Sequence, residues 1–191
     1  LIASVLGALD LPYGQIDTLG ARIGETRIDT GEHVTTPDAP VVQRVLRQMV
    51  DAGMKVALLE TTSHALSQHR VTAVDYDIAV VTNITHEHLD EHGSLEGYRA
   101  AKRSLFERLS RSERKPGVSK LSVINADDSS FEYLAPLPAD RHLRYGIDAK
   151  EVDVRARDIE FAADGTRFTA ETPIGAFPVH SPLLGRFNVY N

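Results

Sequence analysis

Short apolar runs that alternate with helical segments constrain the fold more than any other feature of this sequence. Three such runs lie at 56–59, 78–81 and 121–124, and a fourth strand is predicted at 143–145. Between them, apolar residues recur at helical spacing at 37–53 and 94–109. Strands that alternate with helices are typical of a parallel sheet covered by helices. We therefore expect an α/β fold with a mostly parallel sheet flanked by helices.

The two helical segments carry end signals. Thr36 and Pro37 predict the N-cap and the first position of one helix, and Gly53 predicts its end. Ser94 predicts the N-cap of the other helix. The charge-rich stretch 110–119 after it predicts a mobile loop. The residues that we expect on the buried face of the first helix are Val41, Val45, Leu46, Met49 and Val50.

The pattern changes after about Lys150. Apolar residues then alternate with charged ones as far as Phe161, and the Asp164-Gly165 pair predicts a hairpin turn. Two further strands are predicted at 166–172 and 176–180. The whole chain, 1–191, is thus predicted to be one domain in three parts. Residues 1–150 form a parallel α/β part, residues 151–185 form an antiparallel β subdomain, and residues 186–191 form the start of a helix.

Composition excludes several classes of function. The net charge of −6, with no basic run, argues against a nucleic-acid surface. The absence of cysteine excludes disulfides, zinc-thiolate sites and thiol nucleophiles, and it fits a reducing cytoplasm. No apolar run reaches the ~18 residues of a membrane span, and no signal peptide is visible. We expect a cytoplasmic protein without a membrane span.

Both ends read as interior sequence. The segment 1–9 looks like the later turns of an apolar helix, 186–191 looks like a first helical turn, and there is no initiating Met. We expect a piece of a longer protein.

Polar residues follow two of the predicted strands. Glu60 ends one strand, and Asn83 ends the next and leads into a stretch with three histidines, 86–92. In open α/β sheets, ligands bind beyond the carboxyl ends of the strands. Carboxylates and hydroxyls there favour Mg²⁺. In the alternative interpretation, Glu60 accepts a bond from a nearby amide and the histidines are exposed loop residues.

The histidine stretch also admits a zinc interpretation. His86, His88 and Asp90 follow the His-x-His-x-Asp-His pattern of dinuclear metallohydrolases. Glu91 stands where that pattern needs its last histidine, and the later histidines lie in poor contexts for ligands. Magnesium is therefore the favoured ion.

Two further features suggest anion binding. Thr35 and Thr36 precede a helix, where hydroxyls and amides can hold an anion. Arg70 can grip a phosphate in a bidentate way. The alternatives are simple N-capping by Thr36 and a surface ion pair for Arg70. Neither a Gly-x-x-x-x-Gly-Lys-Ser/Thr loop nor a Gly-x-Gly-x-x-Gly motif is present, so the chain lacks a recognisable triphosphate cradle.

Eight segments, in this order and spacing, carry a resemblance to a known family. They are Thr35-Thr36-Pro37-Asp38-Ala39, Glu60-Thr61-Thr62-Ser63-His64-Ala65-Leu66, Gln68-His69-Arg70-Val71, Thr82-Asn83, His88-Leu89-Asp90-x-His92-Gly93, Tyr98-x-Ala100-Ala101-Lys102, Asn125-Ala126-Asp127-Asp128 and Gly185-x-Phe187-Asn188-x-x-Asn191. The chain resembles the central domain of the Mur ligases. Ser-His-Ala-Leu followed by His-Arg is most similar to the MurE group, which adds the third residue of the peptidoglycan stem peptide.

The resemblance implies a reaction and a set of roles. ATP phosphorylates the terminal carboxylate of a UDP-N-acetylmuramoyl peptide, and the amine of an amino acid attacks the acyl phosphate. Glu60 and His88 would ligate Mg²⁺, and Lys102 would carry a carbamate beside a second Mg²⁺. The residues that match precursor-binding positions are Thr35, Thr36, Thr62, Gln68 and Arg70. Those that match positions near the ATP are Asn83, Asn188 and Asn191.

The sequence departs from the family's pattern in places. The family's phosphate loop should lie just before Leu1, and the domains that bind UDP and read the amino acid are absent, so we expect no ligase activity from this fragment alone. Val34 stands where MurE usually has Asn, and Thr62 stands where it has Ser. His86 replaces the usual Arg, and its role is open.

Two rival functions remain. One is a folylpolyglutamate synthase-like ligase, against which the Ser-His-Ala-Leu to His-Arg segment argues. The other is a non-catalytic paralogue that holds a muramyl nucleotide, against which the presence of Glu60, His88 and Lys102 argues. The sequence does not specify the amino acid that is added or the oligomeric state.

Overall fold

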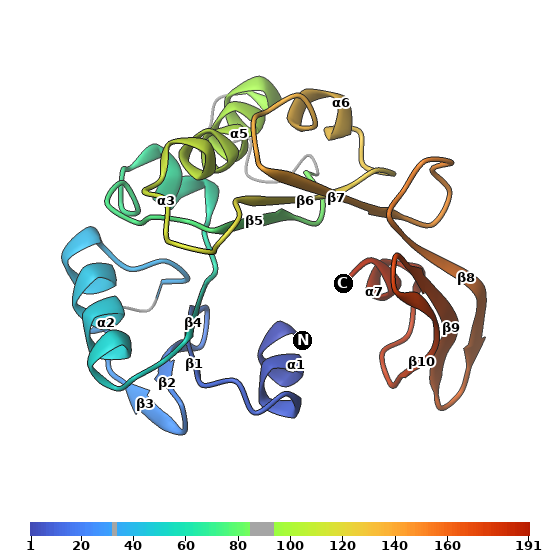
Figure 1. Cartoon of the computed structure of the whole chain (residues 1–191), viewed down its shortest axis with the longest axis horizontal. Coiled ribbons are helices and arrows are strands. Elements are labelled where there is room, and N and C mark those ends of the chain that lie inside the picture. Colours follow the sequence, from blue (N-terminus) through green and yellow to red (C-terminus); the bar gives the residue numbers. More distant parts are fainter. Residues whose placement is uncertain (32–33, 85–93) are drawn as a thin grey trace. The chain divides into compact units, whose positions relative to one another are not determined.

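The chain divides into two compact units. The computed structural model describes residues 1–31, 34–84 and 94–191. The first unit is Leu1–Val74 and the second is Asp75–Asn191 (Figure 1). Each unit is built around a sheet of its own.

The first unit places a short mixed sheet against one long helix. Its elements are α1 (Ile2–Ala8), β1 (Tyr13–Asp17), β2 (Gly20–Ile23), β3 (Thr26–Ile28), α2 (Ala39–Asp51), β4 (Val56–Leu59) and α3 (Ser63–Ser67). The sheet order is β3-β2-β1-β4, and only β1 and β4 run parallel. The core contains Ile16, Ala21, Val45 and Met49. A Cβ at Gly14 would lie 2.6 Å from the Met49 side chain, so α2 packs closely on β1.

The partner of β4 differs from the expectation. We expected 56–59 and 78–81 to share one parallel sheet, but β4 pairs with β1, from Tyr13 opposite Val56 to Ile16 opposite Leu59. The strands β1 to β3 were not predicted. The residues that follow β4 and β5 therefore follow strands of different sheets.

Helix α2 begins later than its sequence suggests. Its N-cap is Asp38, and Pro40 is the proline in its first turn. The predictions of Thr36 as the N-cap and of Pro37 as the first helical residue are therefore wrong. The physical reason is a competing long-range contact of the Thr36 hydroxyl, described below. Val42, Val45 and Met49 form the buried face, whereas Val50 is 64% exposed, contrary to expectation. Gly53 follows the helix with φ +74°, as a helix end requires.

The second unit confirms the predicted fold class. Its elements are β5 (Ile78–Val81), α5 (Leu95–Arg111), β6 (Leu121–Asn125), α6 (Phe131–Leu134), β7 (Arg141–Gly146), β8 (Val154–Ala162), β9 (Gly165–Thr172), β10 (Gly175–Ser181) and α7 (Arg186–Tyr190). The sheet order is β10-β9-β8-β7-β6-β5. Strands β5 to β8 are parallel, and β8 to β10 form the predicted antiparallel part. Ser94 caps α5 by accepting from the amide of Gly97 at 3.0 Å.

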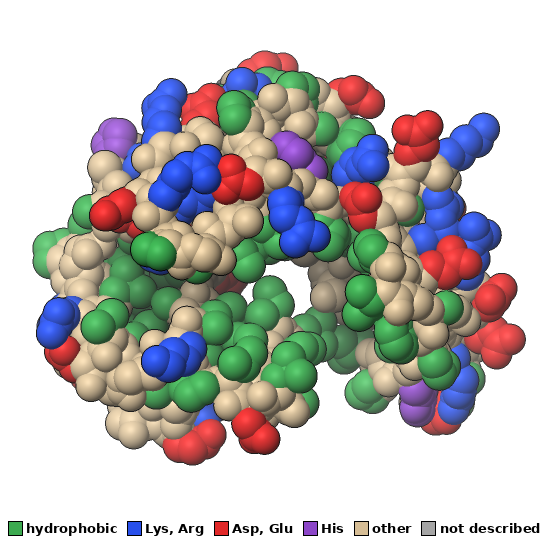
Figure 2. Space-filling view, viewed as in Figure 1, with side chains coloured by type: hydrophobic (Ala, Val, Ile, Leu, Met, Phe, Trp, Pro, Cys, Tyr) green, Lys and Arg blue, Asp and Glu red, His purple; other side chains and the backbone are tan. Residues whose placement is uncertain are grey.

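The antiparallel strands are rich in both charges. Ion pairs link Arg157 to Glu171 at 2.6 Å and Arg167 to Asp164 at 2.5 Å. In Figure 2, acidic and basic side chains are intermixed at the right of the view, over the strands β8 to β10. This mixture agrees with the absence of a basic run in the sequence.

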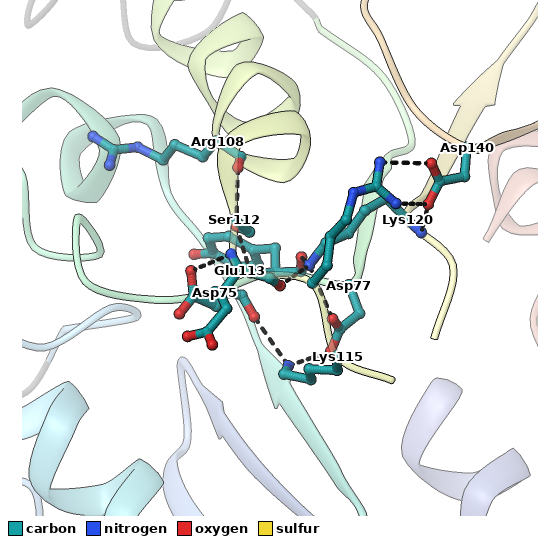
Figure 3. Close-up of polar contacts among 10 residues, drawn as sticks. Asp75, Asp77, Arg108, Ser112, Glu113, Lys115, Lys120 and Asp140 are labelled. Atoms are coloured by element: carbon teal, nitrogen blue, oxygen red, sulfur yellow. Dashed lines mark hydrogen bonds and ion pairs between the residues drawn. The ribbon is translucent and has the colours of Figure 1, made fainter. Parts of the chain in front are cut away.

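A buried lysine fastens the amino ends of the parallel strands. Lys120 is 1% exposed, and its Nζ donates to the carbonyl oxygens of Tyr76 and Glu113, both at 2.7 Å, and to Asp77 Oδ1 at 3.1 Å (Figure 3). Asp77 directly precedes β5, and Lys120 directly precedes β6. Asp77 also pairs with Lys115. Burial disfavours the charge on Asp77, but hydrogen bonds from the two lysines outweigh it and lower the pKa of this carboxyl.

Asp140, which directly precedes β7, connects this strand to Lys120 as well. The Asp140 carboxylate accepts two hydrogen bonds from Arg114, at 2.9 and 2.8 Å, and one from the amide of Lys120 at 2.8 Å. Arg114 and Lys115 both belong to the charge-rich stretch predicted as a loop. The structure thus shows this stretch tied to the starts of three strands.

None of the helices in the described part of the chain combines the length and the apolarity needed to cross a membrane.

Candidate functional site

The first candidate site lies where β1 and β4 end. Because these strands are parallel, their carboxyl ends share one edge of the sheet. The amide and the hydroxyl of Thr18 lie 3.4 and 3.3 Å from Glu60 Oε2 and donate to it. Thr18 Oγ1 also lies 3.1 Å from Thr35 Oγ1. Thr18 was not predicted from the sequence as a site residue. Recognition of the strand β1 would have indicated it, because Thr18 directly follows that strand.

Thr36 links this edge to the next loop. Its side chain is 1% exposed, and its hydroxyl donates to the Glu60 carbonyl oxygen at 2.7 Å. The same hydroxyl accepts from the Thr62 amide at 3.1 Å. Thr62 in turn caps α3 by accepting from the amide of Ala65 at 3.1 Å. Four predicted residues, Thr35, Thr36, Glu60 and Thr62, therefore meet at one place.

Arg70 completes the group from the far end of α3. Its Nη1 donates to the Thr36 carbonyl oxygen at 2.9 Å, and its Nε donates to Gln68 Oε1 at 2.9 Å. Its Nε also lies 3.3 Å from Asp38 Oδ1. His69 just before it has φ +61°, an uncommon conformation for a non-glycine residue, which turns the chain after α3. Gln68 and Arg70 thus belong to the same cluster as the threonines.

The chemistry of this cluster suits a hard cation or an anion with many oxygens. Glu60 is exposed, and both of its described side-chain bonds fall on Oε2. Mg²⁺ prefers oxygen ligands and keeps several waters, so one carboxylate oxygen flanked by hydroxyls fits it. Within 1–31, 34–84 and 94–191, no group of three or more His, Asp or Glu could hold a metal. His88 lies outside these residues, so the ligand set Glu60, His88 and Lys102 stays a prediction.

The second candidate site lies in the other unit, where β5 and β6 end. Asn83 follows β5 and is exposed. Asn125 ends β6 and is 5% exposed, and its Nδ2 donates to the Thr82 carbonyl oxygen at 2.9 Å. Asp128 Oδ2 accepts from the amide of Ile84 at 3.2 Å. The end of β6 and the residues that follow it therefore hold the backbone on both sides of Asn83.

Helix α7 carries the other two predicted nucleotide contacts. Asn188 Nδ2 donates to the Leu184 carbonyl oxygen at 2.8 Å, and Asn191 Nδ2 lies 3.4 Å from Asn188 Oδ1. The two amides are thus neighbours at the end of the chain. Tyr190 donates its hydroxyl to Asp127 Oδ2 at 2.9 Å.

Lys102 lies in the middle of α5. Its side chain is half-buried, and Nζ lies 5.9 Å from the centre of the Tyr98 ring. Glu60 and Lys102 belong to different units. Their joint role with a metal stays a prediction.

A shallow groove lies elsewhere in the second unit. Its volume is about 320 Å³, and its lining residues are Ser122, Ile124, Phe131, Ala135, His142, Leu143 and Arg144. Ser122 and His142 are the second residues of β6 and β7, near the starts of these strands. None of the predicted site residues lines this groove.

Comparison with known proteins gives consistent matches along the whole chain. The Mur ligase middle domain family matches residues 1–191. The sequence is 43% identical over 180 residues to the UDP-N-acetylmuramoyl-L-alanyl-D-glutamate--2,6-diaminopimelate ligase of Geobacillus thermodenitrificans (strain NG80-2), a match that covers 93% of this chain and 36% of that protein. The chain therefore spans little more than a third of that relative's length.

Solved structures agree with the sequence matches. A structure of UDP-N-acetylmuramoyl-L-alanyl-D-glutamate--2,6-diaminopimelate ligase superposes with a TM-score of 0.84 at 32% identity, covering 99% of this chain and 37% of that chain. The Mycobacterium tuberculosis folylpolyglutamate synthase complexed with ADP and AMPPCP gives a TM-score of 0.66 at 18% identity, covering 98% of this chain and 48% of that chain. At that identity, the second likeness shows the fold alone.

Proposed function

The chain belongs to the Mur ligase middle domain family, and from this premise we propose that it is the central ATP- and Mg²⁺-binding domain of a MurE-like amide ligase. The proposed enzyme joins an amino acid to a UDP-N-acetylmuramoyl peptide in peptidoglycan synthesis, in the cytoplasm. One observation carries the proposal. The five residues assigned to precursor binding, which are spread over 36 positions of sequence, converge on one hydrogen-bonded cluster at Glu60. They are Thr35, Thr36, Thr62, Gln68 and Arg70.

The proposed reaction has two steps. An oxygen of the precursor's terminal carboxylate attacks the γ-phosphorus of ATP, and ADP leaves. The amine of the amino acid then attacks the carbonyl carbon of the acyl phosphate, and inorganic phosphate leaves as the amide forms. Phosphoryl transfer depends mostly on positioning and on charge stabilisation rather than on covalent chemistry by the protein.

The residues of the first unit would position the precursor. The hydroxyl of Thr36 is buried between Glu60 and Thr62, so it sets the shape of the loop rather than contacting solvent. Thr35 and Arg70 offer a hydroxyl and a cation at the edges of this loop. A guanidinium suits oxyanion groups because its N–H donors form a planar fork.

The metal would be held by oxygen ligands and one imidazole nitrogen. Glu60 would supply a carboxylate, His88 an imidazole and carbamylated Lys102 a second anionic group. When bound, Mg²⁺ would supply positive charge beside the phosphates of ATP. Asn83, Asn188 and Asn191 of the second unit would contact the nucleotide.

The chain is proposed to work with other domains of the same polypeptide. It spans 36% of its relative's length, and the UDP-binding and amine-binding functions are assigned to the remainder. We therefore expect no phosphate release from the isolated chain, because it lacks a recognisable triphosphate cradle. Measurable turnover by residues 1–191 alone would contradict this expectation.

The test is an assay of the full-length gene product. Phosphate release is measured with Mg·ATP, a UDP-N-acetylmuramoyl dipeptide and a panel of amino acids, and in parallel with a folate substrate and glutamate. We expect turnover that requires the muramyl precursor, and the panel then identifies the amino acid. Turnover with the folate substrate alone would favour the folylpolyglutamate synthase-like alternative. Precursor binding without any turnover would favour a non-catalytic paralogue.

A further inference from the structure

The carboxylate of Asp127 is the centre of a dense set of contacts in the second unit. Its Oδ2 accepts from the amides of Ile147 at 2.6 Å and Asp148 at 3.0 Å, and its Oδ1 accepts from the amide of Ala149 at 2.6 Å. A Cβ at Gly146 would lie 3.1 Å from Oδ2, so the backbone approaches the carboxylate closely. Three successive amides after β7 are thus oriented by one side chain.

These contacts keep the carboxylate charged. Burial disfavours the charge on Asp127, but the amide bonds and the Tyr190 hydroxyl outweigh it and lower the pKa of this carboxyl. Burial and the nearby carboxylate raise the pKa of Tyr190, so its phenol keeps its proton and donates. The pair is therefore a charge-assisted hydrogen bond, which is stronger than a neutral one.

Helix α7 is fastened at two points of one face. Tyr190 donates to Asp127 at 2.9 Å, and one turn earlier Arg186 Nη2 lies 2.6 Å from Asp148 Oδ2. A five-residue helix has little stability of its own, so its direction depends on such contacts. Asn188 lies between the two fastened residues, and Asn191 directly follows the second.

Asp127 also connects to the other predicted nucleotide contact. Its amide donates to Asn125 Oδ1 at 3.0 Å, and Asn125 Nδ2 donates to the carbonyl oxygen of Thr82, the residue before Asn83. The short segment 125–127, at the end of β6, therefore holds both the strand end with Asn83 and the helix with Asn188. All of these contacts lie within the second unit.

We infer that Asp127 and Tyr190 are positioning residues for the purine base of the nucleotide. They fix α7 so that the amides of Asn188 and Asn191 are presented together with the strand end at Asn83. An asparagine side chain offers both donors and an acceptor, which is what the edge of an adenine requires. The inference rests on the proposed function, and it adds two residues that the family resemblance did not assign.

Tyr190→Phe in the full-length enzyme is the main test, because it removes one hydroxyl and keeps the ring. We expect the KM for ATP to rise about tenfold, the effect of losing one bond to a charged group, while kcat and the KM for the precursor stay unchanged. The preference for ATP over GTP in kcat/KM should fall as well. A purely structural role would lower activity with both nucleotides equally.

Tyr133→Phe is the matched control. Tyr133 lies in the same unit, and Arg103 Cζ lies 4.9 Å from the centre of its ring. Phenylalanine would retain this contact. We expect no change in its KM for ATP. Asp127→Asn should have a larger effect than Tyr190→Phe, because its new NH₂ group faces amide donors. If Asp127→Asn does not fold, Tyr190→Phe alone decides the matter.

The outcomes separate this inference from the proposed function. An active wild type with an unchanged KM for ATP and an unchanged ATP preference in Tyr190→Phe would overturn the inference and leave the ligase proposal intact. If the wild type shows no turnover, the ligase proposal fails, and calorimetric titration of ATP into both proteins still tests the inference. Equal ATP affinity of wild type and Tyr190→Phe would then overturn it.

Discussion

Arg70 Nη1 donates a hydrogen bond to the carbonyl oxygen of Thr36 at 2.9 Å, across 34 positions of sequence. The contact ties the end of α3 to the loop before α2. Arg70 forms the ion pair of one sequence interpretation, with Asp38 at 3.3 Å, and it also holds the proposed precursor loop in place. Its grip on a phosphate stays a prediction. Its side chain is 23% exposed, so part of the guanidinium is accessible.

Replacement of Arg70 by alanine should weaken precursor binding in the full-length protein. A charge-assisted bidentate contact is worth roughly 1.5–3 kcal/mol, which is about tenfold or more in affinity. ATP affinity should change less, because the nucleotide contacts are assigned to the second unit. Isothermal titration with precursor and with ATP measures both effects.

Arg47→Ala is the control for Arg70→Ala. Arg47 lies in the same unit, is 72% exposed and pairs with Asp51 one helical turn away. An exposed pair of this kind contributes about 0.3–0.5 kcal/mol, so precursor affinity should not change. Unchanged precursor affinity in Arg70→Ala as well would restrict Arg70 to a structural link.

Lys120→Met should strongly destabilise the chain. The substitution keeps the apolar stem but removes the donor that serves Tyr76, Asp77 and Glu113. A hydrogen bond from a charged group contributes about 1.5–3 kcal/mol, and this variant loses three such bonds. Urea unfolding followed by circular dichroism measures the loss.

The neighbouring lysine provides the comparison. Lys115 also pairs with Asp77, but its side chain is 49% exposed. Lys115→Met should therefore cost less than about 1 kcal/mol. Equal losses in the two variants would show that burial of Lys120 is not the source of its contribution.

The sequence predicted those parts of the fold that depend on local patterns. The strands β5 to β10 follow apolar runs, alternation or a turn signal, and Ser94 caps α5 as expected. The strands β1 to β3 escaped because they are three to five residues long and include glycine and charged residues, too short for a periodic signal. With β1 unrecognised, the parallel pairing of β4 and the place of Thr18 could not be predicted.

For the candidate site, the sequence indicated which residue types take part but not which residues contact one another. Thr36 carries the sequence signal of an N-cap, yet its hydroxyl binds Glu60 and Thr62, residues 24 and 26 positions away. Asp127 and Tyr190 are 63 positions apart. Such contacts are decided by the packing of distant segments, which local propensity does not encode.

Acid should destabilise the second unit through its depressed carboxyl groups. The hydrogen bonds from Arg114 and from the Lys120 amide lower the pKa of Asp140 from 3.8 to about 2. A carboxyl with a lowered pKa in the folded state stabilises the protein above its unfolded pKa, and this contribution is lost as the pH falls through the folded pKa. The pKa values of Asp77, Asp127 and Asp153 are lowered as well, so their contributions have the same sign.

The measurement is the melting temperature between about pH 5 and pH 2, since ordinary carboxyl groups titrate near pH 4. We expect it to fall most steeply between about pH 4 and pH 2 in the wild type. Asp140→Asn should flatten this fall. Glu151→Gln, which removes an exposed carboxylate without an ion pair in the described part of the chain, should leave the slope as it is. A slope in Asp140→Asn identical to that of the wild type would contradict the assignment.

Lys102 is predicted to be carbamylated in the active full-length enzyme. It lies on α5, which begins shortly after the histidine stretch, and a plain ammonium beside Mg²⁺ would be repelled. Two like charges at short range in a partly buried site cost several kcal/mol, roughly 4 kcal/mol at 4 Å. Carbamylation needs the neutral amine, and it converts the cation into an anionic ligand. In ¹³C NMR with labelled bicarbonate, a carbamate signal should appear in the wild type and be absent from Lys102→Ala.

Activity provides the second measurement. Lys102→Ala should lose turnover, and short carboxylic acids such as acetate should partly restore it by taking the place of the carbamate. Lys120→Ala is the control, because Lys120 lies directly before β6 and has a structural role. Acetate should not restore the activity of this variant, because the variant loses activity through loss of folding. Full activity of Lys102→Ala without added acid would show that this side chain is not needed for turnover. A bare ammonium at position 102 in a Mg·ATP-bound structure would show that the lysine acts through its own charge and not through a carbamate.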